Sequence, residues 1–369
     1  MRPQRRLDLA VIGCGAVVDG LYRTALRKVE SRGIARVAVL VDPNPARTAA
    51  LQRHFRSARA FATTDEAFAS STPDLVIVAS PPGRHAEHAA AAFDAGSNVL
   101  CEKPMAPNVA DAERMLAAAH RTDRVLAVGM VRRMFPNLAA ARAILGAGGL
   151  GDDLRFVYRE GLVYSWPVST DAAFRRATAG GGVLTDFGSH AIDFLAALLG
   201  TPTVTAYADD AYGDGVETNC RIELEFPRAS GVMQLSWSQP LVTGLRIVGS
   251  QGELTLDPAR VDAGRWRRHG DRWQALASTV GWPSDLTPAA TRRTPRTYYD
   301  CIHDQLVLAM RAVALGEPVP AGGAEGLAVA RAIELCYAQA RPLHLPWLTA
   351  DEQAQAEQRH WSGERCAAA

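Results

Sequence analysis

Short apolar runs alternate with amphipathic segments along the first third of the chain. The apolar runs occupy residues 7–12, 35–41, 74–79, 99–101 and 125–128. One helix-like segment follows the Gly13–Gly20 stretch and runs through residue 29, and the others occupy residues 43–53, 85–95 and 108–120. Apolar runs without alternation are typical of strands that are buried on both faces of a parallel sheet. The regular order of strand and helix therefore predicts a parallel sheet with helices on both of its faces.

The second half of the chain has a different pattern. Apolar and polar residues alternate in NCRIELEF at residues 219–226, as expected of a sheet with one solvated face. Further strands are predicted at residues 153–159, 204–208, 231–239 and 245–249. Helices are predicted at residues 298–315 and 324–341, whereas the pattern assigns no element to residues 260–295.

A glycine-rich segment and an apolar helix follow each other in GGGVLTDFGSHAIDFLAALLG, residues 180–200. Helical spacing places a broad apolar face on one side of this helix, made of Leu184, Phe187, Ala191, Phe194, Leu195 and Leu198. Asp186, His190 and Asp193 share the opposite edge. A carboxylate one turn from an imidazole suits proton transfer. The alternative is an Asp near the helix dipole with a His that is solvated or paired to Asp193.

The composition indicates a globular protein and argues against a nucleic-acid-binding or membrane protein. A chain of 369 residues with 48% hydrophobic and 21% charged residues predicts two globular domains. With 40 basic and 39 acidic residues, it offers no electrostatic footprint for nucleic acid or an anionic membrane. The apolar run after the basic start is too short for a signal sequence, and no run reaches the length of a membrane span. These features predict a cytoplasmic protein.

The cysteines favour neither disulfides nor a metal site. Six are scattered along the chain without the spacing of zinc ligands, so we expect reduced thiols and no metal. Cys14 and Cys101 flank motifs described below, but no base neighbours either of them in the sequence, and we do not expect them to be nucleophiles.

A glycine turn follows the first predicted strand. Gly13 and Gly15 form a G-x-G between strand and helix, the context in which backbone N–H groups approach a pyrophosphate. The third position of this fingerprint holds Val18, which questions how closely the helix packs on the strand. Asp42 ends the second strand, where an acidic residue binds the ribose hydroxyls of NAD. Alternatively, Asp42 caps the next helix, and the nearby Arg47 leaves NADP open.

Other polar groups lie at the carboxyl ends of the same predicted strands, where ligands bind in parallel sheets. Ser80, Pro81 and Pro82 follow the third strand. Lys103 follows the fourth, where desolvation and a nearby cofactor would lower its pKa toward a catalytic range. Alternatively, Lys103 is a surface charge paired with Glu102.

Taken together, four segments resemble the Gfo/Idh/MocA family (glucose–fructose oxidoreductase, inositol dehydrogenase and relatives). They are VIGCGAVVDGLYRTAL, VIVASPPGRHAEHAAAAFDAG, LCEKPMA and the glycine-rich segment 180–200. The resemblance runs from about Leu7 to Pro342 and implies an α/β Rossmann domain with a parallel sheet, followed by an α+β domain with a large, open, mostly antiparallel sheet. We place the NAD(P)-binding domain at residues 1–130, the substrate and oligomerisation domain at 131–345, and a peripheral tail at 346–369.

The resemblance also implies residue roles. Lys103 contacts the reacting oxygen, and Asp186 and His190 form the polar pair on the substrate side, with His190 as the acid or base. The complete set expected at the cofactor is Gly13, Gly15, Ala16, Val17, Asp42, Ser80, Pro81, Pro82, His85, Glu102, Lys103 and Pro104. Tyr164, Trp166 and Arg175 precede the glycines and suit a sugar, although an ordinary surface loop explains them equally. His303 either reaches the site, as in relatives, or is a core or surface histidine.

The resulting hypothesis is an NAD-dependent oxidoreductase, with NADP possible, that acts on a secondary alcohol or ketone of a sugar, cyclitol or sugar derivative. We expect a homodimer or homotetramer that binds neither nucleic acid nor membrane. The first alternative is a glycoside hydrolase of the same family that oxidises its substrate transiently. The second, a non-catalytic NAD-sensing protein, is disfavoured by the presence of Lys103, Asp186 and His190.

Overall fold

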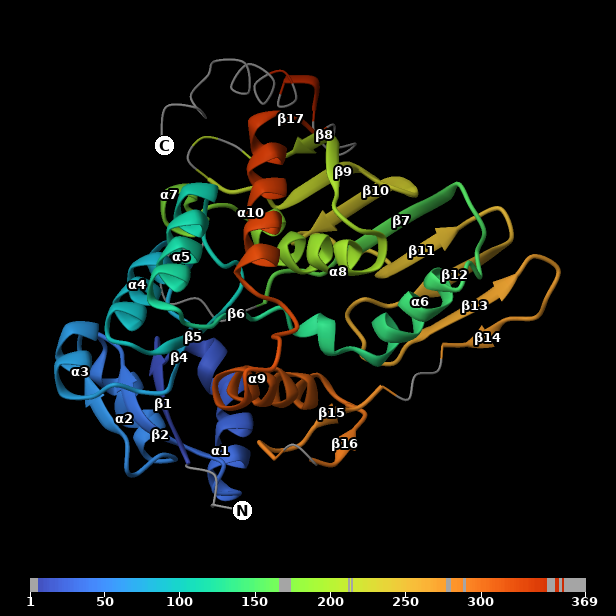
Figure 1. Cartoon of the computed structure of the whole chain (residues 1–369). Coiled ribbons are helices and arrows are strands. Elements are labelled where there is room, and N and C mark those ends of the chain that lie inside the picture. Colours follow the sequence, from blue (N-terminus) through green and yellow to red (C-terminus); the bar gives the residue numbers. More distant parts are fainter. Residues whose placement is uncertain are drawn as a thin grey trace. The chain divides into compact units, whose positions relative to one another are not determined.

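The computed structural model describes residues 6–165, 174–211, 213, 215–276, 280–287, 290–343, 349–351 and 354. The chain divides into two compact units. The first unit comprises Met1–Pro136 and Thr279–Leu327, and the second comprises Asn137–Ser278 and Ala328–Ala369. Figure 1 shows their elements, coloured along the sequence.

A six-stranded parallel sheet forms the centre of the first unit. Its strands are β1 (Leu7–Ile12), β2 (Ala35–Val41), β3 (Arg59–Phe61), β4 (Leu75–Val78), β5 (Asn98–Cys101) and β6 (Leu126–Val128). Their order is β3-β2-β1-β4-β5-β6, so the direction of winding reverses between β1 and β4. Ligands bind at the carboxyl ends of strands beside such a reversal. The predicted parallel sheet is confirmed, although β3 was not predicted because its three residues are largely exposed and carry no apolar run.

Helices cover both faces of this sheet. They are η1 (Val18–Tyr22), α1 (Arg23–Ser31), α2 (Pro45–Gln52), α3 (Thr64–Ser70), η2 (Pro82–Arg84), α4 (His85–Asp94), α5 (Val109–Thr122), η3 (Val131–Met134) and α9 (Tyr298–Leu315). Figure 1 shows α1 packed with α9 on one side and α4 with α5 on the other. A short hairpin of β15 (Trp282–Pro283) and β16 (Arg292–Arg293) belongs to this unit. The bounds of α9 agree with the prediction because a capping box at Thr297 starts it and Gly316, at φ 69°, ends it.

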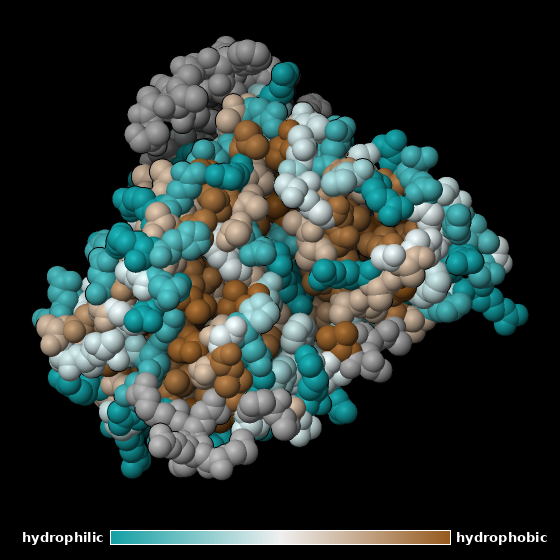
Figure 2. Space-filling view, viewed as in Figure 1, coloured by the Kyte–Doolittle hydropathy of each residue, from teal (hydrophilic) through white to brown (hydrophobic). Residues whose placement is uncertain are grey.

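A nine-stranded sheet dominates the second unit. Its strands are β7 (Leu154–Gly161), β8 (Thr203–Asp209), β9 (Asn219–Phe226), β10 (Ala229–Ser236), β11 (Gly244–Val248), β12 (Gly252–Leu256), β13 (Gly264–Arg268), β14 (Gln274–Ala275) and β17 (Arg341–Pro342). All neighbouring pairs except β7–β10 and β8–β17 are antiparallel, which confirms the expected sheet type. Hydrophilic residues cover the end of the sheet formed by β12 to β14 (teal in Figure 2).

The helices of the second unit are α6 (Pro136–Gly146), α7 (Arg176–Ala179), η5 (Leu184–Gly188), α8 (Ser189–Leu199) and α10 (Gly323–Ala338). α6 starts at the last residue of the first unit's first segment, and α10 starts in the first unit and continues in the second. The sequence pattern did not predict α6. Its sequence, PNLAAARAILG, is apolar on nearly every side and so lacks the polar face that marks an amphipathic helix.

The predicted helix at residues 180–200 contains a π-helical turn, η5, followed by α8, and it ends at Gly200 as expected. On its polar edge, Asp186 is partly exposed and the other two residues are buried. Asp193 is 1% exposed and His190 is 8% exposed, which excludes a solvated histidine. Apolar packing covers the rest: Leu184, Ala191, Phe194 and Leu195 are fully buried.

Among the described residues, one helical stretch, Arg176–Leu199, has the length and the apolar composition of a membrane span. Of its most apolar 18-residue window, 67% is buried inside the protein. Such burial is typical of a core helix in a globular protein, and the stretch also carries Asp186, His190 and Asp193.

Candidate active site

The turn after β1 is a glycine loop that only small residues can form. Gly13 has φ +87°, and a Cβ placed on it would lie 2.6 Å from the backbone of Ala79 and Ser80. A Cβ on Gly15, in contrast, would meet no atom within 4 Å. Gly13 is therefore required for close packing against the end of β4, whereas the space above Gly15 is open to a ligand.

A helix starts immediately after this loop. Ala16 and Val17 are its first helical residues, and the π-helical turn η1 follows them. Such turns occur frequently at functional sites. Val18, in the third position of the glycine fingerprint, is fully buried, and its carbonyl accepts the i+5 bond from the N–H of Arg23. The N–H groups at this helix start are suited to a pyrophosphate.

Asp42 links the glycine loop to the end of β2. It is 4% exposed. Its Oδ2 accepts the N–H of Cys14 at 2.9 Å and its Oδ1 accepts the N–H of Asn44 at 2.9 Å. Asn44, rather than Asp42, caps α2, so the alternative role of Asp42 as that cap is wrong. The Arg47 guanidinium lies 3.7 Å from Oδ2, which leaves the choice between NAD and NADP open at this residue.

His85 ties the end of β4 to the end of β5. Its ring nitrogens lie 2.8 Å from the carbonyl oxygen of Ser80 and 2.9 Å from that of Pro104. The imidazole is 1% exposed, and burial lowers its pKa against the effect of these carbonyls. Pro81 and Pro82 form the turn between Ser80 and α4. His85 therefore fixes two loops of the predicted cofactor site relative to each other.

Glu102 and Lys103 follow β5, and the Lys103–Pro104 peptide bond is cis. The half-buried Glu102 accepts the hydroxyl of Tyr22 on Oε1 at 2.5 Å and the N–H of Lys103 on Oε2 at 3.2 Å. Desolvation raises the pKa of Glu102, and the Tyr22 hydrogen bond and the Lys103 charge lower it in part. Gln305 on α9 donates to the Tyr22 hydroxyl at 2.8 Å.

Sequence reasoning missed Tyr22 and Gln305. Tyr22 lies in a predicted amphipathic helix, where an aromatic residue is ordinarily part of the core. The available signal was Gln305 itself, because a polar amide interrupts the apolar run around Leu306. Only the packing of α9 beside α1 brings Gln305 to Tyr22.

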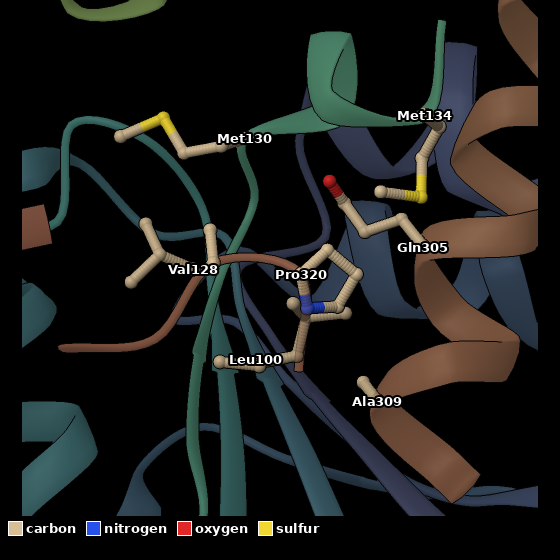
Figure 3. A pocket seen from close by; sticks show the side chains of 9 residues that line it. Leu100, Val128, Met130, Met134, Gln305, Ala309 and Pro320 are labelled. Atoms are coloured by element: carbon tan, nitrogen blue, oxygen red, sulfur yellow. The ribbon is translucent and has the colours of Figure 1, made fainter. Parts of the chain in front are cut away.

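Gln305 also lines a small internal cavity of about 10 Å³, which is room for about one water molecule. Figure 3 shows its walls, which come from β5, β6, η3, α9 and the segment before α10. The lining is Leu100, Ala127, Val128, Met130, Met134, Gln305, Ala309, Pro320 and Ala321. This cavity is too small for a nucleotide and is distinct from the loops described above.

His303, which the sequence left open, is a buried residue of α9 in the first unit. It is 2% exposed, and its Nδ1 lies 3.0 Å from Arg293 and 3.1 Å from Asp304. Burial lowers its pKa. The interpretation as a core histidine therefore fits these contacts.

In the second unit, a buried glutamate holds the segment that carries Asp186. Oε1 of Glu217 accepts the N–H groups of Gly182 and Leu184, each at 2.9 Å. A Cβ on Gly182 would lie 2.0 Å from the carbonyl oxygen of Glu217, so this contact explains one glycine of the triplet. Burial, followed by the charge of Asp209, raises the pKa of Glu217 to about 7. Asp186 stands in the π-helical turn η5, and His190 stands in the first turn of α8.

An aromatic cluster lies beside Asp186. The ring centroid of Trp237 is 4.8 Å from that of Tyr164 and 6.5 Å from those of Phe174 and Phe187. Burial and the negative charge of Asp186 raise the pKa of Tyr164, which places these two residues near each other. The sequence placed Tyr164 and Phe174 in one aromatic loop and Phe187 on the apolar face of the next helix, but it gave no sign that Trp237 joins them.

The structure says less about Arg175 and Trp166, the two other residues of this segment that were predicted to bind the substrate. Arg175 is exposed, and its backbone forms a β-bridge with Gly215. Trp166 lies outside the described residues. No group of three His, Cys, Asp or Glu side chains among the described residues could hold a metal ion. Burial raises the pKa of Cys14 to about 12 and also raises that of Cys101, so neither thiol is activated.

Two family models match the chain. An oxidoreductase family with an NAD-binding Rossmann fold, Gfo/Idh/MocA, matches residues 7–130. The Gfo/Idh/MocA C-terminal domain matches residues 138–255. Both agree with the resemblance inferred from the motifs, and NAD is confirmed as the cofactor class of this fold.

Several proteins similar to this chain are named as dehydrogenases of inositols or of levoglucosan. The chain is 32% identical over 55% of its length to inositol 2-dehydrogenase 2 of Saccharopolyspora erythraea, of which it spans about half (56%). It is 29% identical over 85% of its length to myo-inositol dehydrogenase Hyg17 of Streptomyces leeuwenhoekii, of which it spans 99%. A levoglucosan dehydrogenase, solved with NADH and levoglucosan, has the same fold, with a TM-score of 0.76, 21% identity and coverage of 90% of this chain and 97% of that one.

Proposed function

Because the chain belongs to the Gfo/Idh/MocA oxidoreductase family, we propose that it is an NAD-dependent dehydrogenase of a sugar, cyclitol or sugar derivative. It transfers a hydride between the nicotinamide and a secondary alcohol or ketone. The observation that carries the proposal is the convergence of the glycine loop, Asp42 and Lys103 at the carboxyl ends of β1, β2 and β5 in one parallel sheet. The names of the similar inositol dehydrogenases support the substrate class.

The first unit contains the groups that bind the dinucleotide. The helix start after Gly15 receives the pyrophosphate, since no side chain covers it there. The Asp42 carboxylate, held by two backbone N–H groups, accepts the ribose hydroxyls. Ser80, Pro81, Pro82, Glu102 and Pro104 border the nicotinamide end. When bound, the cofactor accepts or supplies the hydride.

Three residues act on the substrate in this proposal. Lys103 stabilises the charge that develops on the reacting oxygen, and His190 or Lys103 takes its proton. Asp186 orients the imidazole of His190 and selects its tautomer. The aromatic cluster beside Asp186 supplies a stacking surface for the C–H face of a sugar ring, and its Tyr164 senses the charge of that carboxylate.

The wider organisation is part of the same proposal. Residues 1–130 bind the nucleotide, residues 131–345 bind the substrate and mediate oligomerisation as a homodimer or homotetramer, and the tail 346–369 is peripheral. The enzyme works in the cytoplasm.

The test is a panel of sugars, inositols and amino-cyclitols, each supplied with NAD or NADP and followed at about 340 nm, where reduced nicotinamides absorb. We expect net NADH formation with at least one polyol. Cleavage of a glycoside without net NADH would instead identify the hydrolase alternative. Binding of NAD without turnover of any member or glycoside would contradict both enzymes.

A further inference from the structure

Three side chains from separate segments of the first unit form one hydrogen-bond chain. Nε2 of Gln305 donates to the hydroxyl of Tyr22 at 2.8 Å, and that hydroxyl donates to Oε1 of Glu102 at 2.5 Å. Tyr22 is fully buried and Gln305 is 5% exposed. The chain thus joins α9 to the turn after the glycine loop and to the segment that carries Lys103.

The donor and the acceptor of each hydrogen bond in this chain follow from the groups that form it. An amide nitrogen only donates, so the Tyr22 oxygen accepts from Gln305 and its single hydrogen goes to Glu102. Burial, and then the charge of Glu102, raises the pKa of Tyr22 well above its usual value, so the phenol remains a donor at every working pH. The amide oxygen of Gln305 makes no hydrogen bond to a described residue and points into the small cavity of Figure 3.

Glu102 consequently accepts on both of its oxygens. Oε1 receives the Tyr22 hydroxyl and Oε2 receives the backbone N–H of Lys103. An ionised carboxylate accepts on both oxygens, whereas a protonated one must donate from one of them. Donors on both oxygens therefore favour the anionic form of Glu102 against the effect of desolvation.

We propose that Tyr22 and Gln305 are positioning residues of the dehydrogenase: they orient the Glu102 carboxylate, whose Oε2 in turn holds the backbone of Lys103. This inference rests on the proposed role of Lys103 at the reacting oxygen. The ionisable groups that face Glu102 are Tyr22, Lys103 and Cys101, and Tyr298 faces Tyr22.

Removal of the Tyr22 hydroxyl leaves Oε1 of Glu102 without its donor. Because that hydrogen bond lowers the pKa of Glu102, its loss raises this pKa further. Glu102 is then neutral over a wider range of acidic pH, and its Oε2 holds the backbone N–H of Lys103 less strongly there. A purely structural role for Tyr22 would change stability or rate by a factor that is the same at every pH.

The kinetic test compares Tyr22→Phe and Gln305→Leu with Tyr299→Phe, which removes the hydroxyl of an exposed tyrosine on α9. For Tyr22→Phe we expect the acid limb of the kcat profile to move upward by at least about 0.5 pH unit, with KM for NAD within about twofold of wild type. Gln305→Leu should move the limb in the same direction by less. Profiles of Tyr22→Phe and Tyr299→Phe that coincide would overturn the proposal.

A second measurement does not depend on turnover. The free energy of unfolding is followed against pH for wild type, Tyr22→Phe and Glu102→Gln. A raised carboxyl pKa in the folded state contributes stability that is lost as pH rises through that pKa. The loss should extend to higher pH in Tyr22→Phe and be missing in Glu102→Gln. A constant offset between wild type and Tyr22→Phe would contradict the inference, even if no substrate of the panel were oxidised and the proposed function had failed.

Discussion

The phenol of Tyr337 donates a 2.9 Å hydrogen bond to Oε1 of Glu217 inside the second unit. The same oxygen accepts the N–H groups of Gly182 and Leu184, at the start of the segment that carries Asp186. The single hydroxyl hydrogen of Tyr337 is used in its bond to Glu217, so the Tyr337 oxygen can only accept from the hydroxyl of Thr185, which lies 3.0 Å away. A tyrosine and a glutamate thus hold the backbone directly before Asp186.

Tyr337→Phe tests this support. The substitution removes a donor to Glu217 and an acceptor for Thr185, and we expect it to lower the free energy of unfolding by about 1–3 kcal/mol. Displacement of Asp186 should lower kcat by about tenfold, with the affinity for NAD unchanged. Stopped-flow kinetics and urea denaturation measure the two effects.

Tyr207→Phe is the matched control, because Tyr207 packs against the Tyr337 ring with a centroid distance of 5.9 Å. Its buried hydroxyl makes no hydrogen bond to a described residue. We expect this variant to be as stable as wild type or slightly more stable. Equal losses of activity in both variants would show that the hydrogen bond from Tyr337 to Glu217 does not specifically support the turn.

The pKa of Glu217, raised to about 7 by burial and by Asp209, predicts a pH-dependent stability. Between the ordinary glutamate pKa of 4.5 and about 7, the folded state binds more protons than the unfolded state at this residue. This contribution to stability is complete below the lower value and is lost as pH rises through about 7. At about 1.4 kcal/mol per pKa unit, the loss is on the order of 3 kcal/mol.

Glu217→Gln isolates that contribution, since glutamine cannot ionise. The unfolding free energy of wild type, measured relative to Glu217→Gln, should fall as pH is raised from 5 to 8 (roughly the titration window expected for this carboxyl). Chemical denaturation at matched ionic strength provides the comparison. A difference that stays the same across this range would mean that Glu217 has an ordinary pKa.

Alanine substitutions at Gly13 and Gly15 should affect different properties, the first the stability of the protein and the second its affinity for NAD. Gly13→Ala forces a Cβ to within 2.6 Å of the backbone of Ala79 at a φ of +87°, so we expect a loss of about 2–4 kcal/mol in stability. Gly15→Ala meets no atom within 4 Å and should fold as wild type. Its methyl group enters the space proposed for the pyrophosphate, so the affinity for NAD should fall by about tenfold or more.

Isothermal titration with NAD and thermal unfolding separate these outcomes. If Gly15→Ala bound NAD as tightly as wild type, the open space above this residue would not be the pyrophosphate site. If Gly13→Ala were fully stable, the loop would have an alternative conformation that avoids β4.

The sequence could predict those elements whose signal is local. Strand β1 and helix α9 were placed at their observed bounds because an apolar run and a capping box define them without reference to the rest of the chain. Helix α6 was missed because it is apolar nearly all round, and β3 because it is short and exposed. The π-helical turn at Asp186 was also missed, because the sequence pattern was interpreted with the constant residue spacing of an α-helix.

The same difference between local and distant signals applies to the candidate site. Gly13, Asp42 and Lys103 occur at strand ends, which a sequence pattern can locate. Glu217 and Gln305 contact the segments that carry proposed site residues from distant parts of the chain, and these contacts depend on which elements pack together. Only tertiary structure reveals such contacts, because in the sequence Glu217 stands in an ordinary loop before a strand and Gln305 in an ordinary helix.

The last prediction concerns the two proposed catalytic groups. Lys103→Ala and His190→Ala should each abolish turnover, because each removes a group that stabilises charge on, or moves a proton to, the reacting oxygen. NAD and NADH should still bind, since the glycine loop and Asp42 are unchanged in both variants. Steady-state kinetics and the quenching of protein fluorescence by NADH measure these properties separately. Near-full rates in both variants would refute the assignment of the site, whereas loss of nucleotide binding in His190→Ala would mean that this substitution disturbs more than the chemical step.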